Sequence, residues 1–483
     1  MSAMRLSELV RRDVAVDPEI TGVTADSRQV RPGFLFAALP GVKADGRSFI
    51  PAALQAGAAA VLAGNDVEAL AAPVVHAHDL RRAYALAAAA FWGAQPRVCV
   101  AVTGTNGKTS VAAFCRQVFG RLGRSAASMG TLGVRAGETQ ITPPGLTTPD
   151  AADVARLLAD LAGRGVTHMA MEASSHGIDQ RRLDGVRLTA AGFLNLTQDH
   201  LDYHGTMDAY LAAKLRLFET LLPRAGTAVL NADSDAFGAF AATATLSGHS
   251  LLTVGEAGQA LQLALRTPTP AGQRLTIVAE GRRFEVDLPL VGAFQASNAL
   301  VAAGLCVAAG EPVEAVLAAL EHLQGAPGRL QRVGAGPRGG EAYVDYAHTP
   351  DGLETVLAAL RPHVRGRLIV VFGAGGDRDR GKRPMMGAIA QRLADVAIVT
   401  DDNPRSEDPA AIRAAILAAA PGAREIGDRR AAIAAAAALL ADGDVLVVAG
   451  KGHEQGQTVA GVVHPFDDVA ETAAALGLEA AHD

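Results

Sequence analysis

Aromatic residues are scarce in this sequence of 483 residues, where phenylalanine, tryptophan and tyrosine together make up only 4%. Lysine and arginine number 44 against 50 aspartates and glutamates, so the formal net charge is -6 at pH 7. Proteins that bind nucleic acid usually carry a basic surface and aromatic side chains on which bases stack. We therefore expect no nucleic-acid partner.

Cysteines and long apolar runs are also few. Cys99, Cys115 and Cys306 are far apart among apolar residues, so we expect reduced, packed thiols rather than a disulfide or a metal site. Alanine-rich runs such as 431–440 are short and flanked by charges, which is typical of helices and not of membrane spans. Charged residues within 5–13 interrupt any apolar signal-peptide pattern. These features predict a cytoplasmic enzyme without a membrane association.

The chain is too long for one hydrophobic core, and breaks in its pattern predict three α/β domains. Residues 1–96 contain short strand patterns separated by Gly and Pro turns. Residues 97–327 and residues 328–483 alternate apolar strand patterns with helical ones, which indicates parallel sheets. The segment 325–330 is typical of a linker, and we expect closure around it before chemistry.

The most informative stretch is 98–110, which reads VCVAVTGTNGKTS. Its first half is typical of a parallel strand buried on both faces, and its second half is a glycine-rich turn before a helical pattern. Backbone N–H groups of such a turn and the helix N-terminus bind phosphate. Lys108 would reach the terminal phosphates, and Thr109 would place its hydroxyl on Mg²⁺. The turn is shorter than the common form, because Val102 stands at the first glycine position. The predicted nucleotide-binding residues are Gly104, Thr105, Asn106, Gly107, Lys108, Thr109 and Ser110.

Two other predicted strands of this domain end in polar residues. Glu172 ends the strand pattern that begins at His168, and His200 follows the pattern 190–194. Because the carboxyl ends of parallel strands line one crevice, Glu172 and His200 should face the phosphates held by Lys108. With the Thr109 hydroxyl they suit Mg²⁺. Either side chain taken alone is more often a structural hydrogen-bonding group.

Lys214 lies at the edge of an apolar stripe in a helix predicted over 208–222. A lysine in this position usually extends to water, and its spacing alone favours that interpretation. Partial burial would instead lower its pKa and leave a neutral amine that can capture CO₂ as a carbamate. Such a carbamate is a carboxylate-like metal ligand.

The outer domains carry polar clusters of their own. Asp26, Ser27 and Arg28 could contact a polar ligand, although a surface turn with an ion pair is the simpler interpretation. In the middle domain, Asn298 could bind a base or ribose, or cap a helix. The run 373–376 lacks the third glycine of a dinucleotide fingerprint, so we expect no second nucleotide site. The polar loops of the third domain, which suit an anionic, amine-bearing small molecule, are 345–348, 373–383, 401–405 and 450–454.

The order of these motifs resembles that of the Mur ligases, the ATP-dependent amide-forming enzymes of peptidoglycan precursor synthesis. The motifs that carry the resemblance are 103–109, 147–150, 172–176, 195–205, 345–350 and 450–454. The resemblance covers essentially the whole chain. It implies a UDP-binding domain at 1–96, a P-loop-type central ATPase domain at 97–327 and a Rossmann-like domain at 328–483. It also implies ATP and Mg²⁺, an acyl-phosphate intermediate and a monomer.

The resemblance assigns roles to individual residues. UDP-substrate contacts are implied for Ser27, Thr147, Thr148, Ser174, Gln180 and Arg182. ATP-side contacts are implied for Asn298, Arg329, Asp345 and His348, with Arg329 on the terminal phosphate. Lys214 matches the family's carbamylated lysine, which reverses the preference from spacing, and it would bind metal beside Thr109, Glu172 and His200. The catalytic set would be Lys108, Lys214, His200 and Arg329. Gln295 stands where many family members have asparagine. The resemblance therefore does not carry one adenine-side contact over to this position, and the expected activity is unaffected.

The loop Asp402-Asn403-Pro404-Arg405 resembles the family's motif that selects meso-diaminopimelate. The fork of Arg405 can bind the second carboxylate of this amino acid, which lysine lacks, and Asn403 can hydrogen-bond the same stereocentre. The alternative is an Asp–Arg ion pair that orders the loop. Further family contacts to the amino acid match Arg378, Gly450 and Glu454. The expected second substrate is UDP-N-acetylmuramoyl-L-alanyl-D-glutamate.

Two other functions share parts of this pattern. Folylpolyglutamate synthetase has a similar ATPase core but would not account for the Asp26–Arg28 segment or for the loop 402–405. A GTP-dependent switch would normally show a longer phosphate loop and an Asn-Lys-x-Asp motif, and the sequence shows neither.

Overall fold

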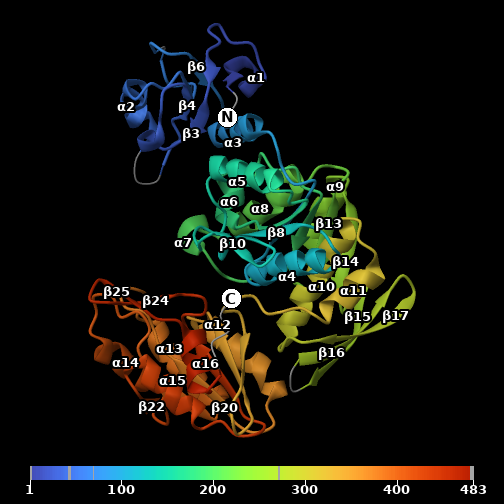
Figure 1. Ribbon diagram of the computed structural model, residues 1–483, viewed down its shortest axis with the longest axis vertical. Coiled ribbons are helices and arrows are strands. Elements are labelled where there is room, and N and C mark those ends of the chain that lie inside the picture. Colours follow the sequence, from blue (N-terminus) through green and yellow to red (C-terminus); the bar gives the residue numbers. More distant parts are fainter. Residues whose placement is uncertain (1–2, 42–44, 69, 270–271, 479–483) are drawn as a thin grey trace. The chain divides into compact units, whose positions relative to one another are not determined.

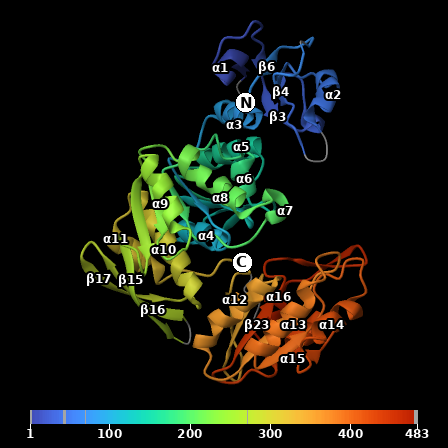
Figure 2. The same ribbon diagram turned by 180° about the vertical axis from the view of Figure 1, so that it is seen from behind.

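The computed structural model describes residues 3–41, 45–68, 70–269 and 272–478. The chain forms two compact units, one of residues 1–261 with 301–316 and the other of 262–300 with 317–483. Helices α10 (Ala293–Ala308) and α11 (Val313–Leu320) are each divided between the units. In the described residues, no helix is both long enough and apolar enough to cross a membrane. Figure 1 shows the elements, and Figure 2 shows them from behind.

The amino-terminal part of the first unit is a small parallel sheet with helices packed on it. Its strands follow one another in order: β3 (Gly22–Thr24), β4 (Phe34–Ala37), β5 (Ala60–Ala63) and β6 (Val74–His76). Leu35 and Leu62 of this sheet share a buried cluster with Leu6 and Tyr84. These come from α1 (Leu6–Val10) and α3 (Leu80–Trp92); the remaining elements are β1 (Met4–Arg5), β2 (Glu19–Ile20) and α2 (Ile50–Gln55). The short strands predicted for this part of the chain are confirmed.

The rest of the first unit is built on a sheet with the strand order β10-β9-β8-β11-β7-β12-β13-β14. The strands are β7 (Val98–Thr103), β8 (Ala126–Gly130), β9 (Gly133–Ala136), β10 (Thr139–Thr142), β11 (His168–Glu172), β12 (Ala190–Phe193), β13 (Thr227–Asn231) and β14 (Ser250–Gly255). All pairings from β8 to β14 are parallel, and β9 and β10 are antiparallel additions. Glu172 pairs with Val102, and Phe193 with Thr103. The three central strands therefore end level, and the loops after them meet at one edge.

The helices of this sheet are α4 (Lys108–Arg121), α5 (Ala151–Gly163), α6 (Ser175–Asp179), α7 (Leu201–His204), α8 (Met207–Arg216) and α9 (Phe237–Leu246). The single helix predicted over 208–222 changes type after α8, because a π-helix occupies Leu217–Leu221. Such π segments inside helices often occur at functional sites.

The second unit contains a doubly wound sheet with the strand order β18-β19-β23-β20-β21-β22. Its strands are β18 (Gln331–Ala335), β19 (Glu341–Asp345), β20 (Leu368–Phe372), β21 (Val396–Val399), β22 (Arg424–Glu425) and β23 (Val445–Ala449). Only β18 is antiparallel to its neighbour. Leu446 and Val448 belong to one buried cluster, and Val445 and Val447 to another, so both faces of β23 are covered.

Helices α12 (Pro350–Leu360), α13 (Lys382–Leu393) and α14 (Pro409–Leu417) supply one of these clusters. The other comes from α15 (Arg429–Ala437), which is the helix predicted from the alanine-rich run, and α16 (Asp468–Ala475). The unit also contains the hairpin β24 (Gly456–Val459) and β25 (Val462–Pro465), and the antiparallel strands β15 (Leu261–Thr269), β16 (Gly272–Ala279) and β17 (Arg282–Leu288). The strand patterns predicted for the third domain are confirmed.

Candidate active site

The predicted phosphate-binding turn lies between β7 and α4. Gly107 adopts φ +89°, a left-handed conformation that favours glycine, and the helix starts at the next residue. Lys108 Nζ donates hydrogen bonds to the carbonyl oxygens of Gly104 at 2.8 Å and Thr105 at 2.9 Å. The ammonium therefore lies over the turn, at the N-terminus of α4, where a phosphate would bind.

Thr109 and Glu172 lie together beside this turn, as predicted from the ends of their strands. The Thr109 hydroxyl donates to Glu172 Oε2 at 3.1 Å, and the Thr131 amide donates to Oε1 at 2.8 Å. A Cβ at Gly130 would collide with the Glu172 carboxylate, so a glycine is needed there. The Thr131 hydroxyl also lies 3.0 Å from that of Thr147.

These oxygen donors fit Mg²⁺, which prefers oxygen ligands and often uses one or two carboxylates together with substrate phosphates. Within the described ranges, no group of three or more His, Cys, Asp or Glu side chains is arranged to hold a metal ion. A metal bound beside Thr109 and Glu172 would therefore need ligands of other kinds.

Lys214 is buried, with 1% of its surface exposed, so the expectation from spacing that it extends to water is wrong. Its Nζ donates to the Gly104 carbonyl at 2.8 Å and lies 4.4 Å from the centre of the Tyr210 ring. Burial, and then the charge of Lys108, lowers the pKa of Lys214 well below its usual value, while Asp199 acts in the opposite direction. A lowered pKa makes the neutral amine, which is the form that reacts with CO₂, more accessible.

His200 lies next to Tyr210 and His176 at the start of α7. Its ring centre is 6.1 Å from that of Tyr210 and 4.9 Å from that of His176, and its Nε2 is 3.4 Å from Asp199 Oδ2. The Tyr210 hydroxyl donates to Thr105 Oγ1 at 3.3 Å. Tyr210 thus connects His200, Lys214 and the phosphate turn. The sequence reasoning missed it, although it stands one helical turn before Lys214.

The residues predicted to contact the muramoyl dipeptide form one hydrogen-bonded network. The Thr148 hydroxyl donates to the Glu172 carbonyl at 3.0 Å and lies 2.9 Å from the Ser174 hydroxyl. Arg182 donates to the Thr148 carbonyl at 2.6 Å and to Gln180 Oε1 at 2.7 Å. Burial lowers the pKa of Arg182. The structure therefore brings these predicted substrate residues next to the proposed metal site.

Ser27 lines a cavity of about 1070 Å³ in the first unit, which Tyr84 and Asp150 also line. Asp26 and Arg28 form an ion pair at 2.7 Å, and both residues line the same cavity as Ser27. The Tyr84 hydroxyl donates to Asp150 Oδ1 at 2.7 Å and joins two walls of the cavity. A cavity of this size can hold a nucleotide-sized ligand.

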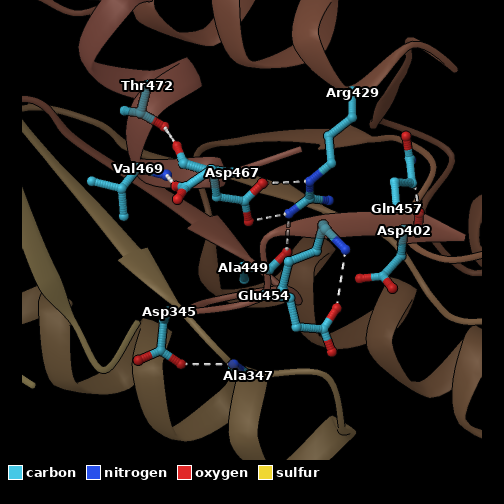
Figure 3. A network of polar contacts seen from close by, with 12 residues as sticks. Asp345, Ala347, Asp402, Arg429, Ala449, Glu454, Gln457, Asp467, Val469 and Thr472 are labelled. Carbon is cyan, nitrogen blue, oxygen red and sulfur yellow. Dashed lines mark hydrogen bonds and ion pairs between the residues drawn. The ribbon is translucent and has the colours of Figure 1, made fainter. Parts of the chain in front are cut away.

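In the second unit, Asp345 is buried at the end of β19, where its carboxylate accepts hydrogen bonds from two backbone amides. Its Oδ2 accepts from the Leu330 amide at 2.7 Å. Its Oδ1 accepts from the Ala347 amide, also at 2.7 Å (Figure 3). Burial raises the pKa of this carboxyl. Arg329, adjacent to Leu330, has its Cζ 4.7 Å from the centre of the Tyr346 ring. Asp345 thus orders the backbone next to Arg329.

Asn298 and Gln295 are linked by hydrogen bonds to the backbone of Arg329. Asn298 Nδ2 donates to Gln295 Oε1 at 3.1 Å, and Gln295 Nε2 donates to the Arg329 carbonyl at 3.2 Å. Gln295 therefore links Asn298 to Arg329 through its amide. His348 Nδ1 lies 2.8 Å from the Tyr346 carbonyl, which brings this predicted residue beside the ring that Arg329 covers.

The loop after β21 contains no Asp402–Arg405 ion pair, so that alternative is wrong. The Arg405 guanidinium donates to the Gly376 carbonyl at 2.7 Å and forms no ion pair with a carboxylate of the described residues. Hydrogen bonds from Ser406, and to a smaller extent the charge of Arg405, lower the pKa of nearby Asp377. Asp402 Oδ1 accepts from the Asn403 amide at 2.6 Å, and its buried Oδ2 accepts no hydrogen bond from the described part of the chain. Asn403 Nδ2 donates to Glu454 Oε2 at 2.9 Å. Arg405 is left able to bind an external carboxylate.

Two glycines allow neighbouring loops to approach the loop 402–405 closely. Gly450 adopts φ +123°, and a Cβ there would lie 2.5 Å from Asp402 Oδ2. A Cβ at Gly376 would collide with the Pro404 carbonyl. The glycine run after β20 therefore serves close packing against the loop 402–405, and Arg378 is exposed on the loop that follows it.

Sequence reasoning missed two buried cations behind these loops, Lys451 and Arg429. Arg429 forms an ion pair with Asp468 at 2.7 Å, and both side chains are fully buried. It also donates to the Ala449 carbonyl at 3.0 Å (Figure 3). In the sequence, Arg429 is a charged residue at the start of an alanine-rich helix. Its position alone does not indicate that it is buried.

Models of three protein domains match the chain. "Mur ligase family, catalytic domain" matches residues 19–92, "Mur ligase middle domain" matches 102–306, and "Mur ligase, glutamate ligase domain" matches 328–452. The UDP-N-acetylmuramoyl-L-alanyl-D-glutamate--2,6-diaminopimelate ligase of Caulobacter vibrioides is 71% identical over 98% of this chain and 98% of its own. The chain belongs to the Mur ligase family.

Other Mur ligases are similar over nearly the whole length. The protein of the same description from Brucella melitensis is 56% identical over 96% of this chain and 95% of its own. A solved structure of a UDP-N-acetylmuramoyl-L-alanyl-D-glutamate--2,6-diaminopimelate ligase superposes with a TM-score of 0.77 at 35% identity, covering 99% of each chain. A Mycobacterium tuberculosis folylpolyglutamate synthase superposes with a TM-score of 0.62 at 20% identity over 82% of this chain and 94% of its own, which shows a shared fold alone.

Proposed function

We propose that this Mur ligase joins meso-diaminopimelate to UDP-N-acetylmuramoyl-L-alanyl-D-glutamate in the cytoplasm, with ATP converted to ADP and phosphate, as a step of peptidoglycan precursor synthesis. The observation that carries the choice of amino acid is the Arg405 guanidinium, which donates to the Gly376 carbonyl and forms no ion pair with a described carboxylate. Relatives whose names specify the same reaction support the proposal. We further propose the domains 1–96, 97–327 and 328–483 and a monomer.

In the first step, the D-glutamyl carboxylate of the substrate attacks the γ-phosphate of ATP, ADP leaves, and an acyl phosphate forms. Two anions must meet, so the site has to offset their repulsion and the charge that develops on the phosphoryl oxygens. Lys108 would supply a positive charge at the phosphate turn, and Arg329 is proposed as a second source of positive charge for the terminal phosphate. Mg²⁺, which would be held by Thr109, Glu172, His200 and a carbamate on Lys214, supplies further positive charge when bound.

In the second step, the amine of diaminopimelate attacks the acyl carbonyl, and phosphate leaves from the tetrahedral intermediate. Arg405 would bind the second carboxylate through its two-pronged fork. Asn403 and Glu454 would bind the amino-acid end at the same stereocentre, with Asp402, Pro404, Gly450 and Arg378 completing the site. The acyl phosphate and the amine must be brought together before this step.

The remaining residues position the two other substrates. Ser27 would bind the uridine nucleotide, and the network of Thr148 would bind the muramoyl dipeptide; its members are Thr147, Thr148, Ser174, Gln180 and Arg182. The residues assigned to ATP are the turn 104–110 together with Asn298, Arg329, Asp345 and His348.

The test is amide formation followed by mass spectrometry, together with phosphate release from ATP. We expect sustained phosphate release only when both the UDP-muramoyl dipeptide and meso-diaminopimelate are present, with product of the mass of their amide. Phosphate release that needs neither substrate would refute a ligase and favour a nucleotide-dependent switch. Equal use of L-lysine would refute the choice of amino acid.

A further inference from the structure

Lys451 lies behind the proposed amino-acid site and has no role in the reaction described above. It follows Gly450 at the end of β23, and its side chain is fully buried. Its Nζ donates to Asn403 Oδ1 at 3.2 Å, to Glu454 Oε2 at 3.0 Å and to the Gly456 carbonyl at 2.5 Å. A buried ammonium is costly unless it is fully hydrogen-bonded, and these three acceptors match its three donors.

The Lys451 ammonium determines which way the Asn403 amide faces. Asn403 Oδ1 accepts from Lys451 Nζ and also from the Thr458 amide at 2.9 Å, while Asn403 Nδ2 donates to Glu454 Oε2. An ammonium and a backbone N–H can only donate, and an ionised carboxylate can only accept. A flipped amide would face two donors with its NH₂ group and a carboxylate with its oxygen, so one orientation is fixed.

The same ammonium reaches the backbone that holds Arg405. The third acceptor of the Lys451 ammonium is the carbonyl of Gly456, the first residue of the hairpin formed by β24 and β25. In this hairpin, the Thr458 carbonyl accepts from the Arg405 amide at 3.0 Å, and the Ala460 amide donates to the Arg405 carbonyl at 2.7 Å. Arg405 itself adopts φ +53°, a conformation that a non-glycine residue keeps only when its surroundings hold it.

We propose that Lys451 is a positioning residue for amino-acid specificity, which orients the Asn403 amide and the Glu454 carboxylate and steadies the hairpin that holds Arg405. The proposal rests on the proposed function, because its effect is read in the choice between two amino acids. Among the described residues, its side-chain hydrogen bonds reach the loops 402–405 and 450–458, so we expect its loss to act on the amino-acid substrate and not on ATP or the UDP-substrate.

The test compares Lys451→Met, which keeps the length of the side chain without its charge, with the wild type. We expect the KM for meso-diaminopimelate to rise about 10- to 100-fold, the usual effect of removing a group that orients a ligand's contacts. We expect the preference for meso-diaminopimelate over L-lysine in kcat/KM to fall about 10-fold or more, with the KM for ATP unchanged. Lys451→Gln keeps a neutral donor, and the same changes should appear with smaller size.

Asp444→Asn is the matched control. Asp444 is buried at the opposite end of the same strand β23, and its Oδ2 lies 2.6 Å from Arg367. This variant should lower the melting temperature without changing the KM or the preference.

Unchanged KM and preference in a folded Lys451→Met or Lys451→Gln protein would overturn the proposal. An equal loss of preference in Asp444→Asn would also overturn it, because the effect would then be one of general stability. Failure of the wild type to join diaminopimelate refutes the proposed function itself, and this result is seen before any variant is compared.

Discussion

Removing the guanidinium of Arg405 should abolish most of the preference for meso-diaminopimelate. Arg405→Ala exchanges one non-glycine residue for another at φ +53°, so the backbone cost of this conformation stays the same. The hydrogen bonds of its amide and carbonyl to the β24–β25 hairpin also remain. The change therefore isolates the side chain, whose hydrogen-bond partner among the described residues is the neutral Gly376 carbonyl.

The size of the effect follows from the bonds that are lost. A hydrogen bond to a charged group contributes about 1.5–3 kcal/mol, and tenfold in kcat/KM corresponds to about 1.4 kcal/mol. Taking about 3 kcal/mol for a two-pronged contact, kcat/KM for meso-diaminopimelate should fall about 100-fold. L-lysine has no second carboxylate, so its kcat/KM should stay the same or rise.

The assay is phosphate release from ATP at saturating UDP-muramoyl dipeptide, with each amino acid varied in turn. Arg405→Lys keeps the charge but not the fork and should lie between the wild type and the alanine variant. Arg392→Ala is the control, because Arg392 forms an exposed ion pair with Glu354 at 2.8 Å on the same unit and should have no effect. An Arg405→Ala protein with an unchanged ratio of kcat/KM values would refute the assignment.

Three other substitutions test the nucleotide and metal side. Lys108→Ala should lower kcat by several orders of magnitude with circular dichroism unchanged, and near-normal ligation would count against the phosphate turn. Lys214→Ala should be nearly inactive and regain part of its activity with added short carboxylates, whereas full activity, or an unmodified wild-type mass at saturating bicarbonate, would exclude a carbamate. Gly130→Ala should displace Glu172, because the new Cβ would collide with its carboxylate, and so raise the Mg²⁺ concentration needed for activity; an unchanged Mg²⁺ dependence would disprove this role of Glu172.

The sequence by itself determined the elements whose signals are local. The unbroken apolar run of β7, the glycine turn and the helix from Lys108 lie within one short stretch, so periodicity and turn chemistry are sufficient to predict them. The strands ending at Glu172 and before Asn195 were predicted in the same way. The level ends of parallel strands then brought Thr109 and Glu172 together as expected.

Only the tertiary structure decided the surroundings of the charged groups. Lys214 is buried because its Nζ meets the Gly104 carbonyl, 110 positions away in the chain, and no helical pattern contains that information. The unpaired guanidinium of Arg405 depends on loops after two other strands. Lys451 likewise finds acceptors at Asn403, 48 positions away, as well as close by at Glu454. Burial and pairing of a charge depend on segments that meet only in the folded chain, so local sequence patterns cannot predict them.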